Sequence, residues 1–194
     1  MVSPVPLGRD ESRADAHEPL GDPRRQVHRR AARVLVLDHT DRILLFLDSD
    51  LGLDPVPHWW ITPGGGVDPG EEDVAAAVRE LWEETGLRLA ASDLIGPMAV
   101  RHVVHGYSDQ VTHQDEVYFA VRVPAFTIDT SGHTEEERLT VAGVRWWTRE
   151  DLTASPEDRW PRTLDAIWSL VERPDSWARG PVALETVEES TVPA

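Results

Sequence analysis

Runs of apolar residues, separated by short polar stretches, mark most of the chain between residues 31 and 148. The first two runs, 31–37 and 43–48, are rich in Val, Ile and Leu, and the polar stretch Asp38–Arg42 separates them. Two β-rich runs joined by so short a connection predict a β-hairpin. Later apolar runs predict four further strands, at 58–62, 94–105, 115–123 and 141–148.

Helical signals occur in three places. Between Pro69 and Gly86 the sequence begins with acidic residues, which suit the positive end of a helix dipole, and it ends in a glycine, which commonly terminates helices. Thr148 predicts the cap of a short helix that begins at Arg149. Apolar residues recur at helical spacing in 161–172, which predicts an amphipathic helix there.

This combination of strands and helices predicts a mixed β-sheet flanked by helices, an α+β or α/β/α sandwich. We place the domain at residues 28–177. Residues 1–27 are rich in Pro, Gly and charge, and residues 178–194 carry a net negative charge and lack aromatic residues, so we expect both ends to be flexible. The predicted loop 124–138 is longer than the usual connection of ~4–6 residues. It suits a segment that closes over a substrate, and ordinary disorder is the alternative.

The overall charge narrows the range of partners. The chain carries 19 basic side chains, none of them lysine, against 35 acidic ones, for a net charge of -16. Polymeric nucleic acid and anionic membranes require clustered cations, so we expect neither as a partner. A small polyanionic substrate stays compatible with this charge if cations gather locally in one pocket. Neither charge nor composition distinguishes a monomer from a homodimer.

Other absences exclude several kinds of chemistry. The chain has no cysteine, which excludes disulfides, thiol catalysis and cysteine-based metal sites. No apolar run approaches the ~18 residues of a membrane-spanning helix. The first 26 residues lack the apolar core of a secretory signal. We therefore expect a cytoplasmic location.

The predicted helix between Pro69 and Gly86 gathers carboxylates on one side. At ~100° per residue, Glu80, Glu83 and Glu84 share an arc of ~100°, and an apolar stripe lies beside them. Carboxylates this close repel one another unless they are solvated or share a cation. Oxygen ligands suit Mg²⁺ or Mn²⁺, and Mg²⁺ commonly bridges carboxylates to substrate phosphates. For an acidic helix taken alone, a solvated face is the alternative.

The spacing of residues over the whole segment favours a metal site over a solvated acidic face. Gly65 is followed after five residues by Glu71, and after seven more by the run Arg79–Leu87, RELWEETGL. This spacing resembles the Nudix box, Gly-x5-Glu-x7-Arg-Glu-U-x-Glu-Glu-x-Gly-U, in which U is a bulky apolar residue. Every fixed position matches, and similar flanks extend the resemblance over about residues 30–172. The resemblance implies the Nudix fold and a hydrolase that uses Mg²⁺ or Mn²⁺ to cleave a diphosphate linkage in a nucleoside diphosphate derivative.

The resemblance also implies roles for single residues. Glu80, Glu83 and Glu84 would be metal ligands, joined by the backbone carbonyl of Gly65. Glu71 would steady the corner between loop and helix, Arg79 would orient the carboxylates, and Gly86 is the structural glycine of the box. The carboxylate that accepts a proton from water stays open, with candidates Glu80, Glu84, Glu116 and the acidic run 135–137.

Substrate-binding residues are hypotheses of a weaker kind. Arg33 and Arg101 could hold phosphates, and Trp59 or Trp60 could stack on a base. Surface ion pairs and core packing are the alternatives for these side chains. A loose cluster of His102, His105 and His113 lacks the spacing of a metal site, so we do not expect it to bind one.

Three functions of the family remain to be compared. An enzyme similar to isopentenyl diphosphate isomerase would need a cysteine, which this chain lacks. A catalytically silent module that only binds nucleotides would be expected to have lost box carboxylates, and all are present. Signals for ADP-ribose, coenzyme A or NADH substrates are not evident. The sequence therefore favours a hydrolase of a nucleoside triphosphate or a related nucleotide.

Overall fold

The computed structural model describes residues 22–135 and 137–194, so the first 21 residues of the expected flexible N-terminus lie outside the described part. The strands are β1 (Arg25–Leu37), β2 (Ile43–Ser49), β3 (His58–Ile61), β4 (Gly64–Gly66), β5 (Ile95–Gly106), β6 (Gln110–Arg122), β7 (Gly143–Trp147), β8 (Asp158–Trp160), β9 (Val182–Ala183) and β10 (Val187–Glu188). The helices are α1 (Asp73–Thr85), α2 (Glu137–Thr140), α3 (Arg149–Ala154) and α4 (Leu164–Val171), with 3₁₀ turns at Ala91–Asp93 and Pro174–Ser176.

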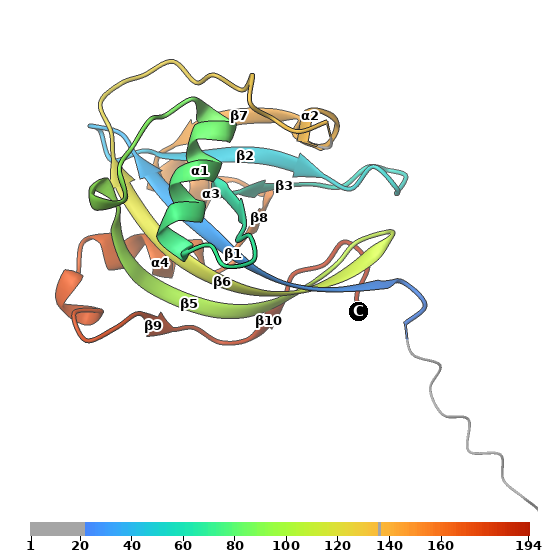
Figure 1. Cartoon of the computed structure of the whole chain (residues 1–194). Coiled ribbons are helices and arrows are strands. Elements are labelled where there is room, and N and C mark those ends of the chain that lie inside the picture. Colours follow the sequence, from blue (N-terminus) through green and yellow to red (C-terminus); the bar gives the residue numbers. More distant parts are fainter. Residues whose placement is uncertain (1–21, 136) are drawn as a thin grey trace, which may run out of the picture.

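The strands form one mixed and strongly curled sheet (Figure 1). Its order is β10-β5-β6-β1-β2-β3-β8, with β1 parallel to β6 and β5 antiparallel to β6. The predicted hairpin joins β1 to β2, but the two strands pair only at Leu37 and Ile43. Beyond that pair β2 turns away and pairs with β3 and β7. The sheet thereby divides into two halves, which enclose part of the core.

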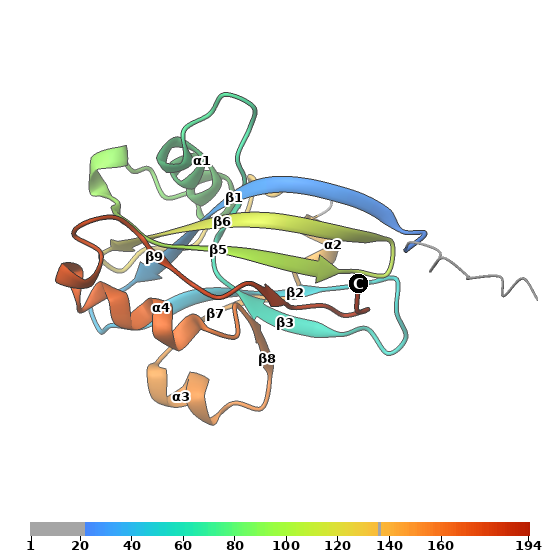
Figure 2. The ribbon, with the colours of Figure 1, turned by 90° about the horizontal axis from the view of Figure 1, so that it is seen from below.

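Helices cover both faces of the long strands (Figure 2). Alternate residues of β1 point to opposite faces, because side chains alternate along a strand. Val34 and Val36 pack with Leu81 of α1, and Leu35 and Leu37 join a second core cluster that includes residues of α4. The predicted mixed sheet with helices on both sides is therefore confirmed.

Several element boundaries differ from the sequence-based prediction. β1 begins at Arg25 and β6 at Gln110, which is several residues before the apolar runs begin. These polar extensions pair with each other along their length, so backbone hydrogen bonds rather than apolar burial hold them. β4 and β8 are too short to have been recognised as apolar runs. No helix in the part of the chain that the structure describes could cross a membrane.

The C-terminal segment also differs from the expectation of a flexible tail. β9 and β10 both pair with β5, which would otherwise be an edge strand of the sheet. In Figure 2 the segment from β9 to the C-terminus runs along β5 like a strap. An edge strand offers unpaired N–H and C=O groups, and these can order a segment whose side chains are mostly polar.

Candidate active site

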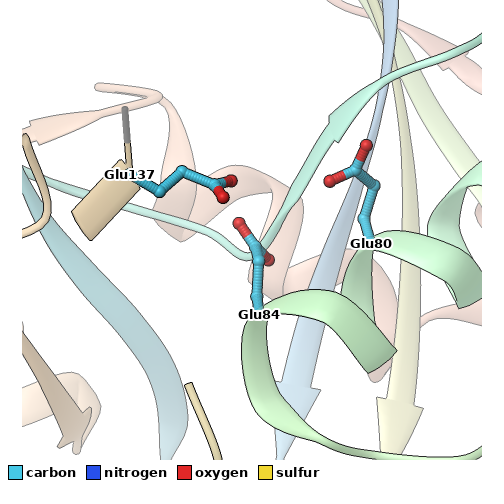
Figure 3. A group of neighbouring side chains, drawn as sticks. All are labelled: Glu80, Glu84 and Glu137. Carbon is cyan, nitrogen blue, oxygen red and sulfur yellow. The ribbon is translucent and has the colours of Figure 1, made fainter. Parts of the chain in front are cut away.

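Helix α1 has the boundaries that its sequence predicts. Gly86 ends it in the left-handed conformation, with a φ of 73°, and donates its N–H to the carbonyl oxygen of Trp82. Ala76, Ala77 and Leu81 are buried and hold the helix against the sheet. This docking turns the Glu80 and Glu84 side of the helix toward the Gly64–Gly66 strand, β4 (Figure 3).

The glycines of β4 permit a very close approach to these carboxylates. Gly64 has a φ of +118°, and a Cβ there would lie 2.1 Å from the carbonyl oxygen of Ala32. Its N–H donates to Glu84 Oε2 at 2.7 Å. A Cβ on Gly65 would lie only 2.6 Å from Glu80 Oε2. A side chain at either position would therefore displace backbone or the carboxylates themselves.

A Gly65→Ala variant should lose activity by about tenfold or more, because the added methyl group displaces the Glu80 carboxylate from its position. Gly66→Ala is the matched control, since a Cβ at Gly66 meets no atom within 4 Å. Turnover at saturating metal and the urea midpoint would be measured for both variants. Equal turnover in the two variants would show that the position of Glu80 does not matter for the reaction.

Arg79 lies at the centre of the acidic side of α1. Its guanidinium donates to both carboxylate oxygens of Glu71, at 3.0 and 2.9 Å, and to Glu80 at 2.7 Å and Glu83 at 3.2 Å. It also donates to the carbonyl oxygen of Gly66 at 2.8 Å. These hydrogen bonds from Arg79 lower the pKa of Glu71 to about 2. The same cation therefore ties the loop before the helix to the carboxylates on it.

The long loop after β6 packs against the C-terminal end of α1. Asp129 donates its N–H to the carbonyl oxygen of Thr85 at 3.0 Å, and His133 Nε2 lies 3.2 Å from that of Glu84. Gly132 approaches so closely that a Cβ there would lie 2.4 Å from the backbone oxygen of Glu83. These contacts place the start of α2, and with it Glu137, opposite α1.

Glu80, Glu84 and Glu137 form the candidate metal site (Figure 3). One carboxylate oxygen from each lies within 4.8 Å of the others. Burial is the main cause that raises the pKa of Glu84 to about 8, and it also raises that of Glu80. Keeping these groups ionised is costly without a cation, and an all-oxygen donor set suits Mg²⁺ or Mn²⁺. The residues present therefore fit the divalent ion that the sequence predicts.

The sequence missed Glu137 as a partner of Glu80 and Glu84, although the acidic run 135–137 was a candidate source of the proton acceptor. Its only signal was that acidic run in a long loop, and spacing along the chain cannot place such a loop. Glu83, predicted as a ligand, is on the same helix but lies outside this group and pairs with Arg79. Its role as a ligand stays a prediction.

Glu116 lies on the opposite face of the sheet from α1. There it accepts hydrogen bonds from Arg101 Nε at 2.5 Å, from Arg33 Nε at 3.4 Å, and from Gln114 and Tyr118. Burial favours its neutral form, but Arg101 and Arg33 outweigh burial and lower the pKa of Glu116 to about 2. A carboxylate this weakly basic, held by two arginines, is poorly suited to accept a proton in catalysis.

All four candidate substrate-binding residues are buried, including Trp59, which is 2% exposed. Arg33 is 7% and Arg101 4% exposed, and both pair with Glu116. Trp60 is 6% exposed and packs edge to face on Trp147, with ring centroids 5.0 Å apart. This arrangement fits the alternatives of ion pairing and core packing better than contact with a substrate.

The predicted loose cluster of histidines is divided between the two faces of the sheet. His105 is 1% exposed, and its Nδ1 lies 2.8 Å from the carbonyl oxygen of Glu189. His102 and His113 face the other side, where His113 stacks on His28 at 4.6 Å. His102 and His113 stack with ring centroids 6.1 Å apart, whereas His105 lies on the opposite face, so the three rings do not converge on a common point.

Comparison with known proteins agrees with this geometry. The family model described as NUDIX domain matches residues 27–166. A putative 8-oxo-dGTP diphosphatase of Bacillus subtilis (strain 168) is 44% identical over 120 residues, which cover 62% of this chain and 66% of that protein. An RNA pyrophosphohydrolase of Bartonella quintana is 37% identical over 67 residues, 31% of this chain and 37% of that protein. The chain thus spans less than two thirds of the length of either relative.

The fold itself matches solved structures. The crystal structure of a MutT protein from Bacillus halodurans superposes with a TM-score of 0.52 and 18% sequence identity, covering 84% of this chain and 91% of that one. At this identity the likeness concerns the fold alone.

Proposed function

This chain belongs to the NUDIX family, and from that membership we propose that it hydrolyses a phosphoanhydride bond of a nucleoside diphosphate derivative with the help of Mg²⁺ or Mn²⁺. The observation that carries the proposal is the convergence of Glu80, Glu84 and Glu137 within 4.8 Å. These side chains come from two elements, α1 and α2, which the tertiary fold brings together.

The site residues have distinct tasks in the proposed reaction. Glu80, Glu84 and Glu137 would hold the cation. Gly64 fixes Glu84 through its N–H, and Arg79 fixes Glu80 through its guanidinium. When bound, a divalent ion neutralises phosphate charge and makes water more acidic.

The proton acceptor belongs to the same group of carboxylates in this proposal. Glu116 points to the other face of the sheet, and its charge is neutralised by two arginines. Within this group, burial raises the pKa of Glu84 to about 8 in the metal-free protein. A base is most effective when its pKa lies near the working pH.

We propose a nucleoside triphosphate as the substrate, cleaved to a monophosphate and pyrophosphate. The Bacillus subtilis relative matches over a longer stretch than the RNA pyrophosphohydrolase. It is named as a putative diphosphatase of 8-oxo-dGTP. The two compared relatives, that protein and the RNA pyrophosphohydrolase, carry names that share the hydrolysis of a diphosphate linkage attached to a nucleotide. Oxidised and ordinary deoxynucleoside triphosphates are therefore the first substrates to test.

The test is a screen of purified protein against nucleoside triphosphates, 8-oxo-dGTP, nucleotide sugars, dinucleoside polyphosphates and triphosphorylated RNA. Each reaction is run with Mg²⁺, with Mn²⁺ and with excess EDTA, and released pyrophosphate or phosphate is measured. We expect metal-dependent release of pyrophosphate from a triphosphate and none with EDTA. Tight nucleotide binding without turnover in any reaction would instead identify a silent binding module.

A further inference from the structure

The C-terminal strap, residues 182–192, lies beyond the matched family domain, which ends at residue 166. Its backbone follows β5 closely. Leu184 donates its N–H to the carbonyl oxygen of Val100, and Glu189 donates to that of Val104, both at 2.9 Å. At Gly106 a Cβ would lie 2.0 Å from the backbone oxygen of Val192, so the contact is too close for any other residue. The strap is thus an integral part of the folded domain.

The strap inserts one carboxylate into the protein interior. Glu189 is 1% exposed, whereas its neighbour Glu188 is exposed. One carboxylate oxygen of Glu189 accepts from Arg101 Nη2 at 2.9 Å, and the other accepts from the N–H of Arg162 at 2.7 Å. Burying a carboxylate is costly unless it is paired and hydrogen-bonded, and Glu189 is both.

From Glu189 a continuous row of opposite charges crosses the interior. Arg101 contacts Glu189 on one side and Glu116 on the other, and Glu116 also contacts Arg33. The two arginines and two glutamates balance, so the buried row is neutral as a whole. Removing the carboxylate of Glu189 would leave an excess positive charge, which Glu116 alone would have to compensate.

The far end of this row touches the candidate metal site. Arg33 Nη1 donates to the carbonyl oxygen of Gly64, the residue whose N–H holds Glu84 at 2.7 Å. The next residue is Gly65, against which Glu80 packs. Apart from the backbone of Gly64 itself, every link between Glu189 and Glu84 is therefore a hydrogen bond or ion pair between named groups.

We propose that Glu189 is a positioning residue for the candidate metal site, acting through Arg101, Glu116 and Arg33 on strand β4 at Gly64. The proposal rests on the metal-dependent hydrolysis proposed above. Without the Glu189 carboxylate, Arg101 keeps only Glu116 as a carboxylate partner and draws it away from Arg33, whose Nε lies 3.4 Å from Glu116. Strand β4 at Gly64 and Gly65 then no longer holds Glu84 and Glu80 at their mutual distance. The C-terminal strap is in this way a working part of the enzyme.

The experiment compares Glu189→Gln with Glu185→Gln in the full-length chain. Both variants remove one negative charge from the strap, but Glu185 is exposed. Three quantities are measured well below the melting temperature: the dissociation constant of Mn²⁺, kcat and KM for the nucleotide substrate, and the amide chemical shifts of Gly64 and Gly65. For Glu189→Gln we expect about tenfold weaker Mn²⁺ binding, about tenfold lower kcat and shifted Gly64 and Gly65 amides. The KM of Glu189→Gln should stay near the wild-type value. For Glu185→Gln, Mn²⁺ binding, kcat, KM and both amide shifts should all stay near the wild-type values.

A purely structural role of Glu189 would give a different result, in which the melting temperature falls while Mn²⁺ binding and both amides are unchanged. That result would overturn the proposal. If Glu189→Gln does not fold, Glu189→Asp replaces it, because its shorter side chain cannot reach Arg101 and the Arg162 N–H together. If wild type hydrolyses none of the nucleotides, the proposed function fails. The Gly64 and Gly65 amide shifts still decide whether Glu189 acts on strand β4.

Discussion

The Glu84→Gln variant is expected to lose nucleotide hydrolysis by on the order of 10³-fold while it keeps its fold. Glutamine retains an oxygen that can accept the N–H of Gly64, now at 2.7 Å from the carboxylate. It removes one of the three negative charges that lie within 4.8 Å of one another. A loss of ~4 kcal/mol in transition-state stabilisation corresponds to this factor. Steady-state kinetics with saturating Mg²⁺ and a Mn²⁺ titration measure the effect.

In the metal-free protein, Glu84→Gln should not lower the free energy of unfolding, in contrast to its effect on activity. Burial raises the pKa of Glu84 from 4.5 to about 8. The stability that protonated Glu84 contributes is complete below pH ~4.5 and is lost as the pH rises toward 8. Glutamine is never charged, so Glu84→Gln should need at least as much urea as the wild type to unfold at pH 7.

Two comparison variants, one at the residue that precedes α1 and one on α1, make this prediction specific. Glu72 is exposed, and Glu72→Gln should leave turnover unchanged. Glu83 lies outside the group of three carboxylates, so Glu83→Gln should lose less activity than Glu84→Gln. Near-normal turnover of Glu84→Gln, or an equal loss in Glu72→Gln, would contradict the assignment of the metal site.

The Glu116→Gln variant is expected to lose about 3–5 kcal/mol of unfolding free energy. Glu116 is 3% exposed and pairs with both Arg33 and Arg101. Removing its charge leaves two guanidinium groups in the interior without their shared partner. Breaking a buried ion pair from one side is far more damaging than losing an exposed one. Urea unfolding followed by the fluorescence of the eight Trp residues measures the change.

Asp115→Asn is the matched control for this loss. Asp115 precedes Glu116 on β6, but its side chain is 71% exposed and pairs with His102 at the surface. Its replacement should change the unfolding free energy by less than about 1 kcal/mol. If Glu116→Gln were as stable as Asp115→Asn but inactive, Glu116 would act in catalysis itself, as the sequence had suggested, and not as a structural partner of the arginines.

Local patterns predicted most of the elements correctly. Residues close together in the chain determine the connection between β1 and β2, the C-terminal end of α1 and the cap at Thr148. The Thr148 side chain accepts a hydrogen bond from the N–H of Asp151. The family also follows from local spacing, because the residues from Gly65 to Leu87 occupy one strand and the helix after it. Such signals need no knowledge of the tertiary fold.

The residues that were placed less well depend on contacts between distant segments. Glu116 was one of the candidates for the proton acceptor, but the side of the sheet that it faces depends on where α1 docks. Glu137 lies at the candidate metal site because the backbone of Asp129 and the side chain of His133 contact the end of α1. The strap is ordered by pairing with β5, and the composition of the strap does not reveal that partner.

By itself the sequence determined the family, since the spacing of glycine and glutamate along one loop and helix matches the Nudix box, and that resemblance implies a divalent metal and a diphosphate substrate. Only the tertiary structure decided which carboxylates meet, which are neutralised by arginine, and that a C-terminal glutamate is linked to the site. The physical reason is the distance along the chain over which each kind of interaction acts. Helical periodicity and capping act over a few residues, whereas ion pairs such as Arg101 with Glu189 join residues that lie 88 positions apart and form only when the sheet is assembled.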